Sequence, residues 1–333
     1  MKKYKMAAAM LPVLLMGCSG MEMKNTTEDP GVQVVELDLT DKNAVGNPQT
    51  GTEEALLNGT EDLPADSETT AMEEPSENTD ILVFRDAFGE EYETAILQNI
   101  PKTVCDNSRF VHEGDRLYYE DENYHSAIGI DISKYQGEID WEKVRADGIE
   151  FVFIRIGYRG YGEAGKLMAD EMFDANIRDA QAQGLDVGVY LFSQAINEEE
   201  AVEEAHFVID HLQGYELQLP VVYDPETIRN DKARTDDVTG EQFTKNTIAF
   251  CEAVKEAGYQ PMVYSNMVWE AFQFQMEELT EYPFWYADYE DLPQTPYRYE
   301  YWQYSEKGQV DGISGTVDMN LRLIPGEGEA SEP

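Results

Sequence analysis

Four carboxylates stand at or near the ends of short apolar runs in the second half of the chain. They are Asp131, Asp224, Glu226 and Asp318. Asp224 and Glu226 are two positions apart, so an extended backbone places both on one face, and Pro225 between them fits only a strand end or a sheet edge. Glycoside hydrolysis uses such a set, because one carboxyl group donates a proton to the leaving oxygen while another stays ionised beside an oxocarbenium-like transition state.

Aromatic side chains crowd the same run ends. Sugar rings have apolar C–H faces that stack on aromatic rings, and their hydroxyl groups bind polar side chains. Taken alone, each of these rings is more often a core residue. As a set they predict an oligosaccharide-binding groove. The predicted substrate contacts are Tyr190, Phe192, Tyr223, Tyr264, Trp285, Trp302 and Gln303.

Strand-like and helix-like runs alternate after residue 126, which is typical of βα units with a parallel sheet. Helices are expected over residues 168–183, 197–212 and 239–257, each followed by a glycine that can end it. The last three strand-like runs leave little room for helices. We therefore expect an α/β fold with an irregular, flattened or incomplete TIM-like (β/α) barrel, whose active site lies at the carboxyl ends of the strands. The strand-like runs begin near residues 127, 151, 186, 220, 260, 284, 299 and 316.

The first 18 residues have the pattern of an export signal. Three lysines precede an apolar run over residues 6–16 that is too short to span a bilayer. The run ends in Leu-Met-Gly-Cys, which resembles the lipobox of bacterial lipoproteins and implies that Cys18 is lipidated and anchors the protein to the membrane. The alternative is an ordinary cleaved signal peptide with a chance cysteine. Either way we expect an extracytoplasmic protein of the bacterial cell envelope, and the lipobox favours a lipid anchor.

The remaining chain divides by composition. Residues 19–80 are acidic and poor in aromatic residues, which predicts a disordered linker. Residues 81–125 alternate short apolar runs with turn formers and predict a small β module, either a wall-binding module or, as we favour, a structural spacer. The barrel is expected over residues 126–325, followed by a tail at 326–333.

Charge and metal-ligand patterns exclude several classes of function. A net charge of −43 leaves no basic stripe for nucleic acid. The three cysteines and four histidines have no metal-ligand spacing. We therefore expect no metal and no cofactor. The sequence leaves the oligomeric state open, and we expect a monomer.

Several segments of the barrel region resemble the glycoside hydrolase family 25 lysozymes, which are muramidases. The resemblance follows the order of the chain from residue 126 to 323. It implies that the substrate is the glycan strand of peptidoglycan, cut with retention at the β-1,4 bond between N-acetylmuramic acid and N-acetylglucosamine. The matching segments are GIDISKYQGEIDW from 129, GLDVGVYLFSQA from 184, PVVYDPE from 220, YS at 264 and VDMN from 317.

By matching position, the resemblance implies that Glu226 is the general acid. Asp224 is implied as its partner, which stabilises the transition state or orients the N-acetyl group of the substrate. Asp131 and Asp318 complete the acidic pocket. Covalent and substrate-assisted routes to retention both remain open.

Two positions depart from the family pattern. Pro225 replaces the aliphatic residue usual between the paired acids, and Leu191 replaces a usual histidine. Neither change removes a carboxylate, so an active enzyme is expected. The alternatives are a non-catalytic peptidoglycan-binding lipoprotein on the same barrel and a glycosidase that acts on another N-acetylated polysaccharide such as chitin.

Overall fold

The computed structural model describes residues 80–229 and 231–326. The predicted signal peptide, the lipidation site Cys18, most of the acidic linker and nearly all of the C-terminal tail lie outside the described residues. The described residues belong to a single compact unit. None of the helices within that part has both the length and the apolar character needed to cross a bilayer.

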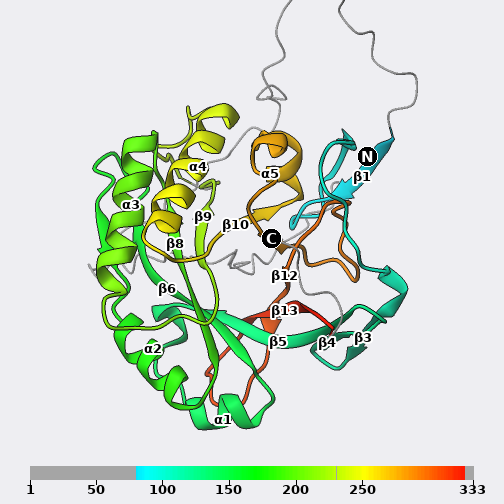
Figure 1. The fold of residues 1–333 in the computed structure, drawn as a ribbon, viewed down its shortest axis with the longest axis vertical. Coiled ribbons are helices and arrows are strands. Elements are labelled where there is room, and N and C mark those ends of the chain that lie inside the picture. The colour runs from blue at the N-terminus through cyan, green and yellow to red at the C-terminus, as the bar shows by residue number, and fades with distance from the viewer. Residues whose placement is uncertain (1–79, 230, 327–333) are drawn as a thin grey trace, which may run out of the picture. The chain divides into compact units, whose positions relative to one another are not determined.

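Eight strands form a closed barrel, because β5 pairs with β6 on one side and with β13 on the other (Figure 1). All eight predicted strand runs are confirmed, whereas the prediction of an incomplete barrel is wrong. A short β7 (Leu167–Ala169) pairs with β6 outside the closed ring. The barrel strands are β5 (Tyr124–Ile132), β6 (Phe151–Arg159), β8 (Asp186–Ser193), β9 (Val221–Pro225), β10 (Pro261–Asn266), β11 (Phe284–Ala287), β12 (Tyr301–Gly308) and β13 (Val317–Pro325).

The last strand, β13, runs antiparallel to both of its neighbours, whereas the other seven strands are parallel. Residues 309–316 join β12 to β13 and are too few for a parallel crossover, which needs about a dozen residues or more. The beginning of β13 therefore lies at the carboxyl ends of the parallel strands. Asp318 reaches that edge from the start of its strand, in register with Asp131.

Helices cover only part of the barrel. The three predicted helices are confirmed as α2 (Phe173–Ala182), α3 (Glu198–His211) and α4 (Gly240–Glu256). α2 begins later than expected because residues 167–169 form β7. Two short helices escaped prediction, α1 (Trp141–Ala146) and α5 (Met267–Phe272), and each begins at an Asp or Asn whose side chain accepts a backbone N–H. The 3-10 turns are η1 (Asn107–Arg109), η2 (Lys134–Gln136) and η3 (Met276–Glu278).

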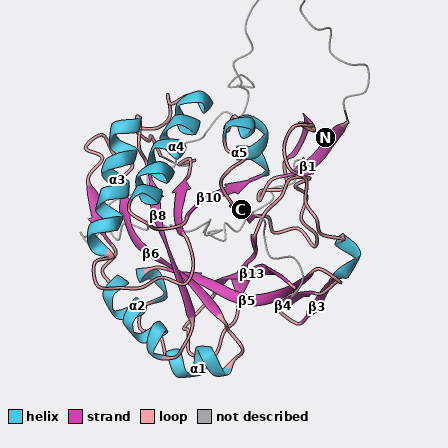
Figure 2. Ribbon diagram, viewed as in Figure 1, coloured by secondary structure: helices cyan, strands magenta, loops and turns pink. Residues whose placement is uncertain are grey.

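Residues ahead of the barrel form two separate hairpins rather than one sheet. They consist of β1 (Ile81–Arg85) with β2 (Glu91–Ala95), and β3 (Phe110–Glu113) with β4 (Arg116–Tyr119). Figure 2 shows these hairpins on the side opposite α2 and α3. The β3–β4 hairpin packs on β12, where the ring centres of Phe110 and Trp302 are 5.2 Å apart. This hairpin therefore covers a part of the barrel wall whose strands are not separated by long helices.

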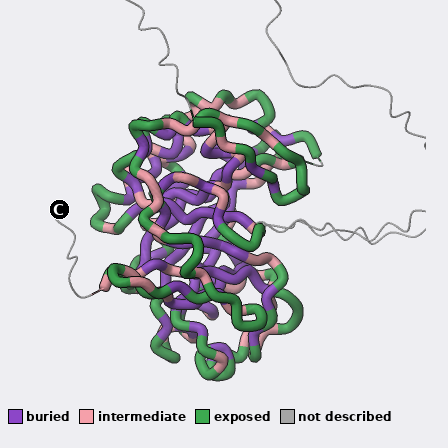
Figure 3. The backbone as a smooth tube through the Cα atoms, turned by 90° about the vertical axis from the view of Figure 1, so that its right-hand side faces the viewer, coloured by how far each residue is buried: buried purple, intermediate pink, exposed green. Residues whose placement is uncertain are grey.

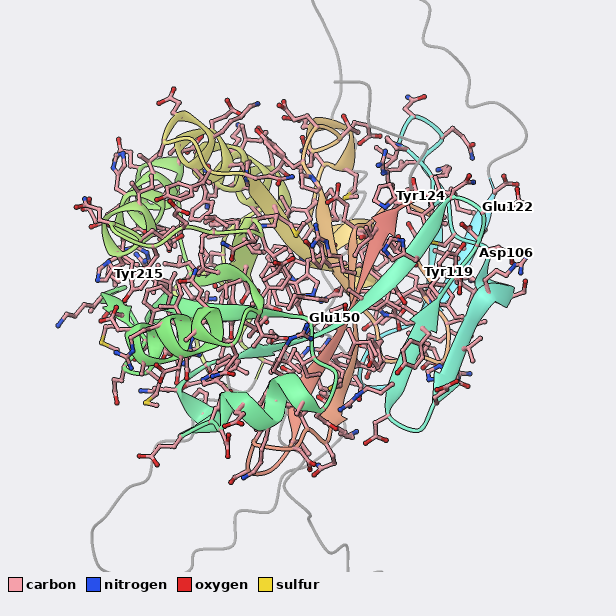
Figure 4. The ribbon with its side chains drawn as sticks, turned by 60° about the horizontal axis from the view of Figure 1, so that its bottom comes forward. Asp106, Tyr119, Glu122, Tyr124, Glu150 and Tyr215 are labelled. Atoms are coloured by element: carbon pink, nitrogen blue, oxygen red, sulfur yellow. The ribbon has the colours of Figure 1, made fainter. Side chains whose placement is uncertain are left out.

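The connection from the second hairpin to β5 is tied by hydrogen bonds. Asp106 N donates to the Tyr119 hydroxyl at 3.1 Å, and Tyr119 N donates to Ser126 Oγ at 2.8 Å. Figure 4 shows Asp106 and Tyr119 on the same side of the molecule as Tyr124, where β5 begins. The hairpin and the first barrel strand are thus held together by both packing and hydrogen bonds.

Figure 3 shows a buried centre within an exposed outline. The buried hydrophobic residues divide into two clusters. One cluster fills the barrel interior and includes Phe151, Phe153 and Trp285. The other lies between the outer face of the barrel and its covering helices and hairpins. Strand residues alternate between these layers, so a shift of one position decides which layer a side chain enters. Cys105 and Cys251 are both free.

Leu117 tests whether the β3–β4 hairpin is part of the folded barrel. Its side chain is fully buried against the outer layer, so Leu117→Ala should lower the free energy of unfolding by about 2–5 kcal/mol. Urea denaturation measures this change. The matched control is Val111→Ala on β3, whose side chain is 52% exposed, and it should change stability by no more than about 0.5 kcal/mol. Equal effects of the two substitutions would contradict a covering role.

Candidate active site

The barrel interior changes from apolar to polar toward the carboxyl ends of the parallel strands. On β6, Phe151 and Phe153 belong to the interior cluster, and alternation places Arg155 on the same face beyond them. On β9, Val222 belongs to that cluster and Asp224 follows it on the same face. The polar layer built in this way contains Asp131, Arg155, Asp224, Gln303, Asp318 and Asn320.

Asp131 is held by two side-chain amides. Its Oδ2 accepts hydrogen bonds from Gln303 Nε2 and from Asn320 Nδ2, each at 2.8 Å. Hydrogen bonds donated to a carboxylate favour its charged form. Asp131 is therefore the carboxyl group of the cluster that is best solvated by the protein itself.

The two amides are themselves oriented by aromatic side chains. Gln303 Oε1 accepts from the hydroxyl groups of Tyr264 at 2.9 Å and Tyr289 at 2.8 Å. Asn320 Oδ1 accepts from Trp285 Nε1 at 2.7 Å. Each amide oxygen is thus occupied, so the amide N–H groups point at Asp131.

Asp318 lies beside Asp131 and interacts with it directly. Burial raises the pKa of Asp318 well above its usual value, and the charge of Asp131 and a hydrogen bond between the two carboxyl groups raise it further. Two carboxyl groups in hydrogen-bond contact share a proton, because both cannot be ionised at that distance. Asp318 therefore carries the proton of this pair while Asp131 carries the negative charge.

Asp224 and Glu226 form a second carboxyl pair. Asp224 is 0% exposed, and neither of its carboxyl oxygens has a hydrogen-bond partner among the described residues. The Oε1 atom of Glu226 is also buried and has no hydrogen-bond partner among these residues. Burial and the charges of Glu226 and Asp131 raise the pKa of Asp224 well above its usual value. Burial, with a further contribution from Asp131, raises the pKa of Glu226 to about 8. Glu226 is consequently protonated at neutral pH.

Arg155 supplies the positive charge of this site, and the sequence analysis did not identify it. Its Nε and Nη2 donate to Asp170 Oδ2 at 2.9 and 2.7 Å. Its guanidinium lies 5.2 Å from the ring centre of Tyr135 and 5.3 Å from that of Tyr158. Its charge lowers the pKa values of both Asp224 and Glu226, against the larger effect of burial. The run Phe-Val-Phe-Ile-Arg contains the signal that was missed, since alternation continues the interior face to the arginine.

The predicted substrate-contact residues divide between the two faces of the barrel wall. Tyr190, Tyr264 and Trp285 belong to the interior cluster, Gln303 contacts Asp131, and Phe192 pairs in register with Asp224. Tyr223 and Trp302 instead face the outer layer. The Tyr223 hydroxyl lies 2.8 Å from the Ser193 hydroxyl and its ring packs on Phe250 of α4, while Trp302 packs on Phe110.

The two residues that depart from the family pattern, Leu191 and Pro225, face the outer side of the barrel wall and not the carboxyl cluster. Leu191 is fully buried in the outer layer, so the missing histidine does not remove a group from the interior face. Pro225 is the last residue of β9 and pairs in register with Ser193. Neither position interrupts the alternation that brings Asp224 to the interior.

An α/β barrel with protonated and ionised carboxyl groups at the carboxyl ends of its strands has the arrangement of a glycoside hydrolase. The sequence matches the family description Glycosyl hydrolases family 25 over residues 130–313. The chain belongs to this family and is a glycoside hydrolase of the lysozyme type.

Related proteins share the barrel region. Over 202 residues the chain is 30% identical to the uncharacterized protein YegX of Escherichia coli (strain K12), covering 58% of this chain and 68% of that protein. Over 201 residues it is 26% identical to Lysozyme M1 of Streptomyces globisporus, covering 58% and 66%. Its structure resembles the modular autolysin LytC from Streptococcus pneumoniae, solved in complex with a synthetic peptidoglycan ligand. The two structures align with a TM-score of 0.52 and 26% sequence identity, and the alignment covers 73% of this chain and 56% of the autolysin chain.

The raised pKa of Glu226 predicts a dependence of stability on pH. A glutamate with a folded pKa of about 8 and an ordinary value of 4.5 contributes stability below pH 4.5 that is lost as the pH rises toward 8. Glu226→Gln removes this loss. The variant should therefore unfold near the wild-type temperature at pH 4.5 and at a clearly higher temperature at pH 8, measured by calorimetry. Glu216→Gln, which changes an exposed glutamate, is the control. A constant difference between Glu226→Gln and wild type across this range would contradict the raised pKa.

Proposed function

We propose that the protein is a peptidoglycan hydrolase, an N-acetylmuramidase that cleaves the β-1,4 bond between N-acetylmuramic acid and N-acetylglucosamine with retention. The observation that carries this proposal is the cluster of carboxyl groups at the carboxyl ends of the barrel strands, where Asp131 accepts amide hydrogen bonds and Asp224 has no hydrogen-bond partner among the described residues. Burial of its carboxyl group and the charge of Asp131 raise the pKa of Glu226 to about 8, while Asp131 itself accepts two amide hydrogen bonds. Named lysozymes among the relatives, and a structural neighbour solved with a peptidoglycan ligand, support the choice of substrate.

In the proposed mechanism Glu226 is the general acid. It holds its proton at neutral pH and donates it to the oxygen of the leaving sugar, as a carboxylic acid with a raised pKa can do. The negative charge of Asp131 stabilises the positive charge that develops on the sugar ring. Gln303 and Asn320 hold Asp131 in place for this task.

Asp224 and Asp318 have supporting roles in this mechanism. We propose that Asp224 orients the N-acetyl group of the substrate. Its buried carboxyl oxygens have no hydrogen-bond partner among the described residues. Retention would then proceed either through that acetamido group or through a covalent enzyme intermediate. Asp318 holds the proton it shares with Asp131 and limits the charge at the site to one carboxylate.

Of the predicted substrate contacts, Phe192 and Tyr264 remain proposed contacts with sugar rings. Tyr190 is fully buried, and its ring packs edge-on against Trp285 with the ring centres 6.0 Å apart. Trp285 and Gln303 are fully buried, and we propose that they act through their hydrogen bonds on Asn320 and Asp131. The substrate lies outside the cytoplasm. The proposed export signal, and a lipid on Cys18, would place the enzyme at the outer face of the membrane within reach of the wall.

The proposed activity is tested by incubating the purified protein with purified peptidoglycan and measuring the release of reducing ends. The products should end in reducing N-acetylmuramic acid by mass spectrometry. Glu226→Gln should lower the rate by about 10²–10⁴, because it removes the general acid, while Glu216→Gln should keep the wild-type rate. Binding to peptidoglycan without release of reducing ends would instead identify a non-catalytic peptidoglycan-binding protein, and cleavage of chitin in preference would change the substrate.

Arg155 should set the upper pH limit of the activity. The rate should fall as the pH rises through about 8, since Glu226 then loses its proton. Arg155→Met combined with Asp170→Asn removes the ion pair without leaving an unpaired buried charge. Loss of the positive charge should raise the pKa of Glu226 further and move the alkaline limb of the pH–rate profile to higher pH. Asp170→Asn alone keeps the positive charge, so its alkaline limb should stay below that of the double variant. A double variant whose limb matched that of wild type would show that Arg155 does not act on Glu226.

A further inference from the structure

Glu226 lies one residue beyond the end of its strand. β9 ends at Pro225, which pairs in register with Ser193 at the end of β8. Because proline has no backbone N–H, the last residue of β9 cannot donate a hydrogen bond to a neighbouring strand. The strand pairing that fixes Asp224 therefore stops before it reaches Glu226. A general acid that protonates one particular oxygen must nevertheless be held within a fraction of an ångström of its working position.

The side chain of Gln194 provides the missing support. Gln194 follows Ser193 directly and is only 1% exposed. Its Nε2 donates to the main-chain oxygen of Glu226 at 2.6 Å and to that of Ser193 at 3.0 Å. One amide group thus bridges the end of β8 and the residue that follows β9.

The orientation of this amide is fixed by a third partner. Gln194 Oε1 accepts a hydrogen bond from Thr235 Oγ1 at 3.0 Å. A reversed amide would place its oxygen against the two carbonyl oxygens of Ser193 and Glu226, so only one orientation is stable. Gln194 therefore also ties Glu226 to residue 235, where the chain returns toward α4.

An ion pair holds the backbone of Gln194 itself. Arg234 Nη1 donates to the main-chain oxygen of Gln194 at 3.2 Å, and its two terminal nitrogens donate to the two carboxyl oxygens of Glu200 at 2.7 Å each. Glu200 belongs to α3 and Arg234 to the segment after Glu226. This bidentate pair fixes the same junction from the helix side.

We propose that Gln194 is a positioning residue that fixes the backbone of Glu226 and thereby keeps its carboxyl group buried and aimed at the leaving oxygen. The inference rests on the proposed function, because it concerns the general acid of that reaction. It assigns to Gln194 the support that Pro225 cannot give. The role is distinct from those of the carboxyl groups, since Gln194 acts only through Glu226.

Gln194→Met tests the proposal. Methionine keeps the length of the side chain and removes both amide donors. If Gln194 positions the acid, kcat should fall about 10- to 100-fold, the size expected for a displacement of up to about 1 Å, while KM stays within about a factor of two. The alkaline limb of the pH–rate profile should also move to lower pH, because a freed Glu226 reaches solvent and its pKa falls from about 8.

Asn246 offers a matched control for a merely structural role. It is buried on α4, and its Nδ2 donates to the main-chain oxygen of Ala195 at 2.9 Å, next to Gln194, with no hydrogen bond to Glu226. Asn246→Leu should lower the unfolding temperature and leave kcat and the pH profile unchanged. If Gln194→Met behaves in this way too, Gln194 is a structural residue and the proposal fails.

A second variant covers the case in which Gln194→Met does not fold. Gln194→Glu keeps the shape of the side chain, and its neutral acid form still has one O–H donor, whereas its charged form would repel the carbonyl oxygen of Glu226. Its kcat relative to wild type should therefore be highest at low pH and decrease as the pH rises. A ratio independent of pH would contradict the proposal.

A measurement without turnover separates this inference from the proposed function. Glutamate labelled with carbon-13 at its carboxyl group can be titrated by NMR, and the Glu226 signal is identified by its absence in Glu226→Gln. Gln194→Met should lower the titration midpoint of Glu226 relative to wild type. An unchanged midpoint would overturn the positioning role even if wild type cleaves peptidoglycan, whereas a lowered midpoint would support it even if wild type proves inactive.

Discussion

The rest of the site depends on the two amide hydrogen bonds that favour the charged form of Asp131. Two amide groups donate to one oxygen of this carboxylate, and aromatic hydroxyl and indole groups hold the amides in turn. Burial raises the pKa values of Asp224, Glu226 and Asp318, and the charge of Asp131 raises them further, so these carboxyl groups retain their protons. The positive charge of Arg155 lowers the pKa values of Asp224 and Glu226 and so limits this effect. The split between protonated and ionised acids thus follows from where hydrogen-bond donors are present and where they are absent.

The same arrangement lowers the stability of the folded protein. Carboxyl oxygens of Asp224 and Glu226 are buried without a hydrogen-bond partner among the described residues, and an unsatisfied buried polar group costs about 1–3 kcal/mol. The barrel tolerates this because its wall is packed on both faces. Helices cover one part of the wall, and the β3–β4 hairpin covers β12 through contacts such as that of Phe110 with Trp302. The segment before the barrel is therefore part of its structure.

Glu226 illustrates how the fold supplies precision beyond a strand end. Asp224 is fixed by strand pairing, whereas Glu226 follows a proline that ends the strand. The backbone there is held by a side chain, Gln194, and by a helix through Glu200 and Arg234. The main chain of Glu226 is thus bound by a side chain at the point where strand pairing has ended.

Sequence patterns alone determined the eight strands, the three long helices and the four acids at one edge of the barrel. Each depends on local information, namely the period of apolar residues and the residue type at the end of a run. The antiparallel direction of β13 was not predicted, although the connection over residues 309–316 is too short for a parallel crossover and its length can be read from the sequence. The sequence patterns also did not show that Tyr223 and Trp302 face the outer layer. A shift of one residue along a strand moves a side chain from one face of the barrel wall to the other.

Only the tertiary structure identified Arg155, Asn320 and Gln194 as parts of the site. Their partners are Asp170, Asp131 and the main chain of Glu226, which lie 15 to 189 residues away along the chain. The pKa of Glu226 belongs to the same category. Residue type makes it an acid, but the burial and the charges that keep its proton exist only once distant strands have closed into a barrel.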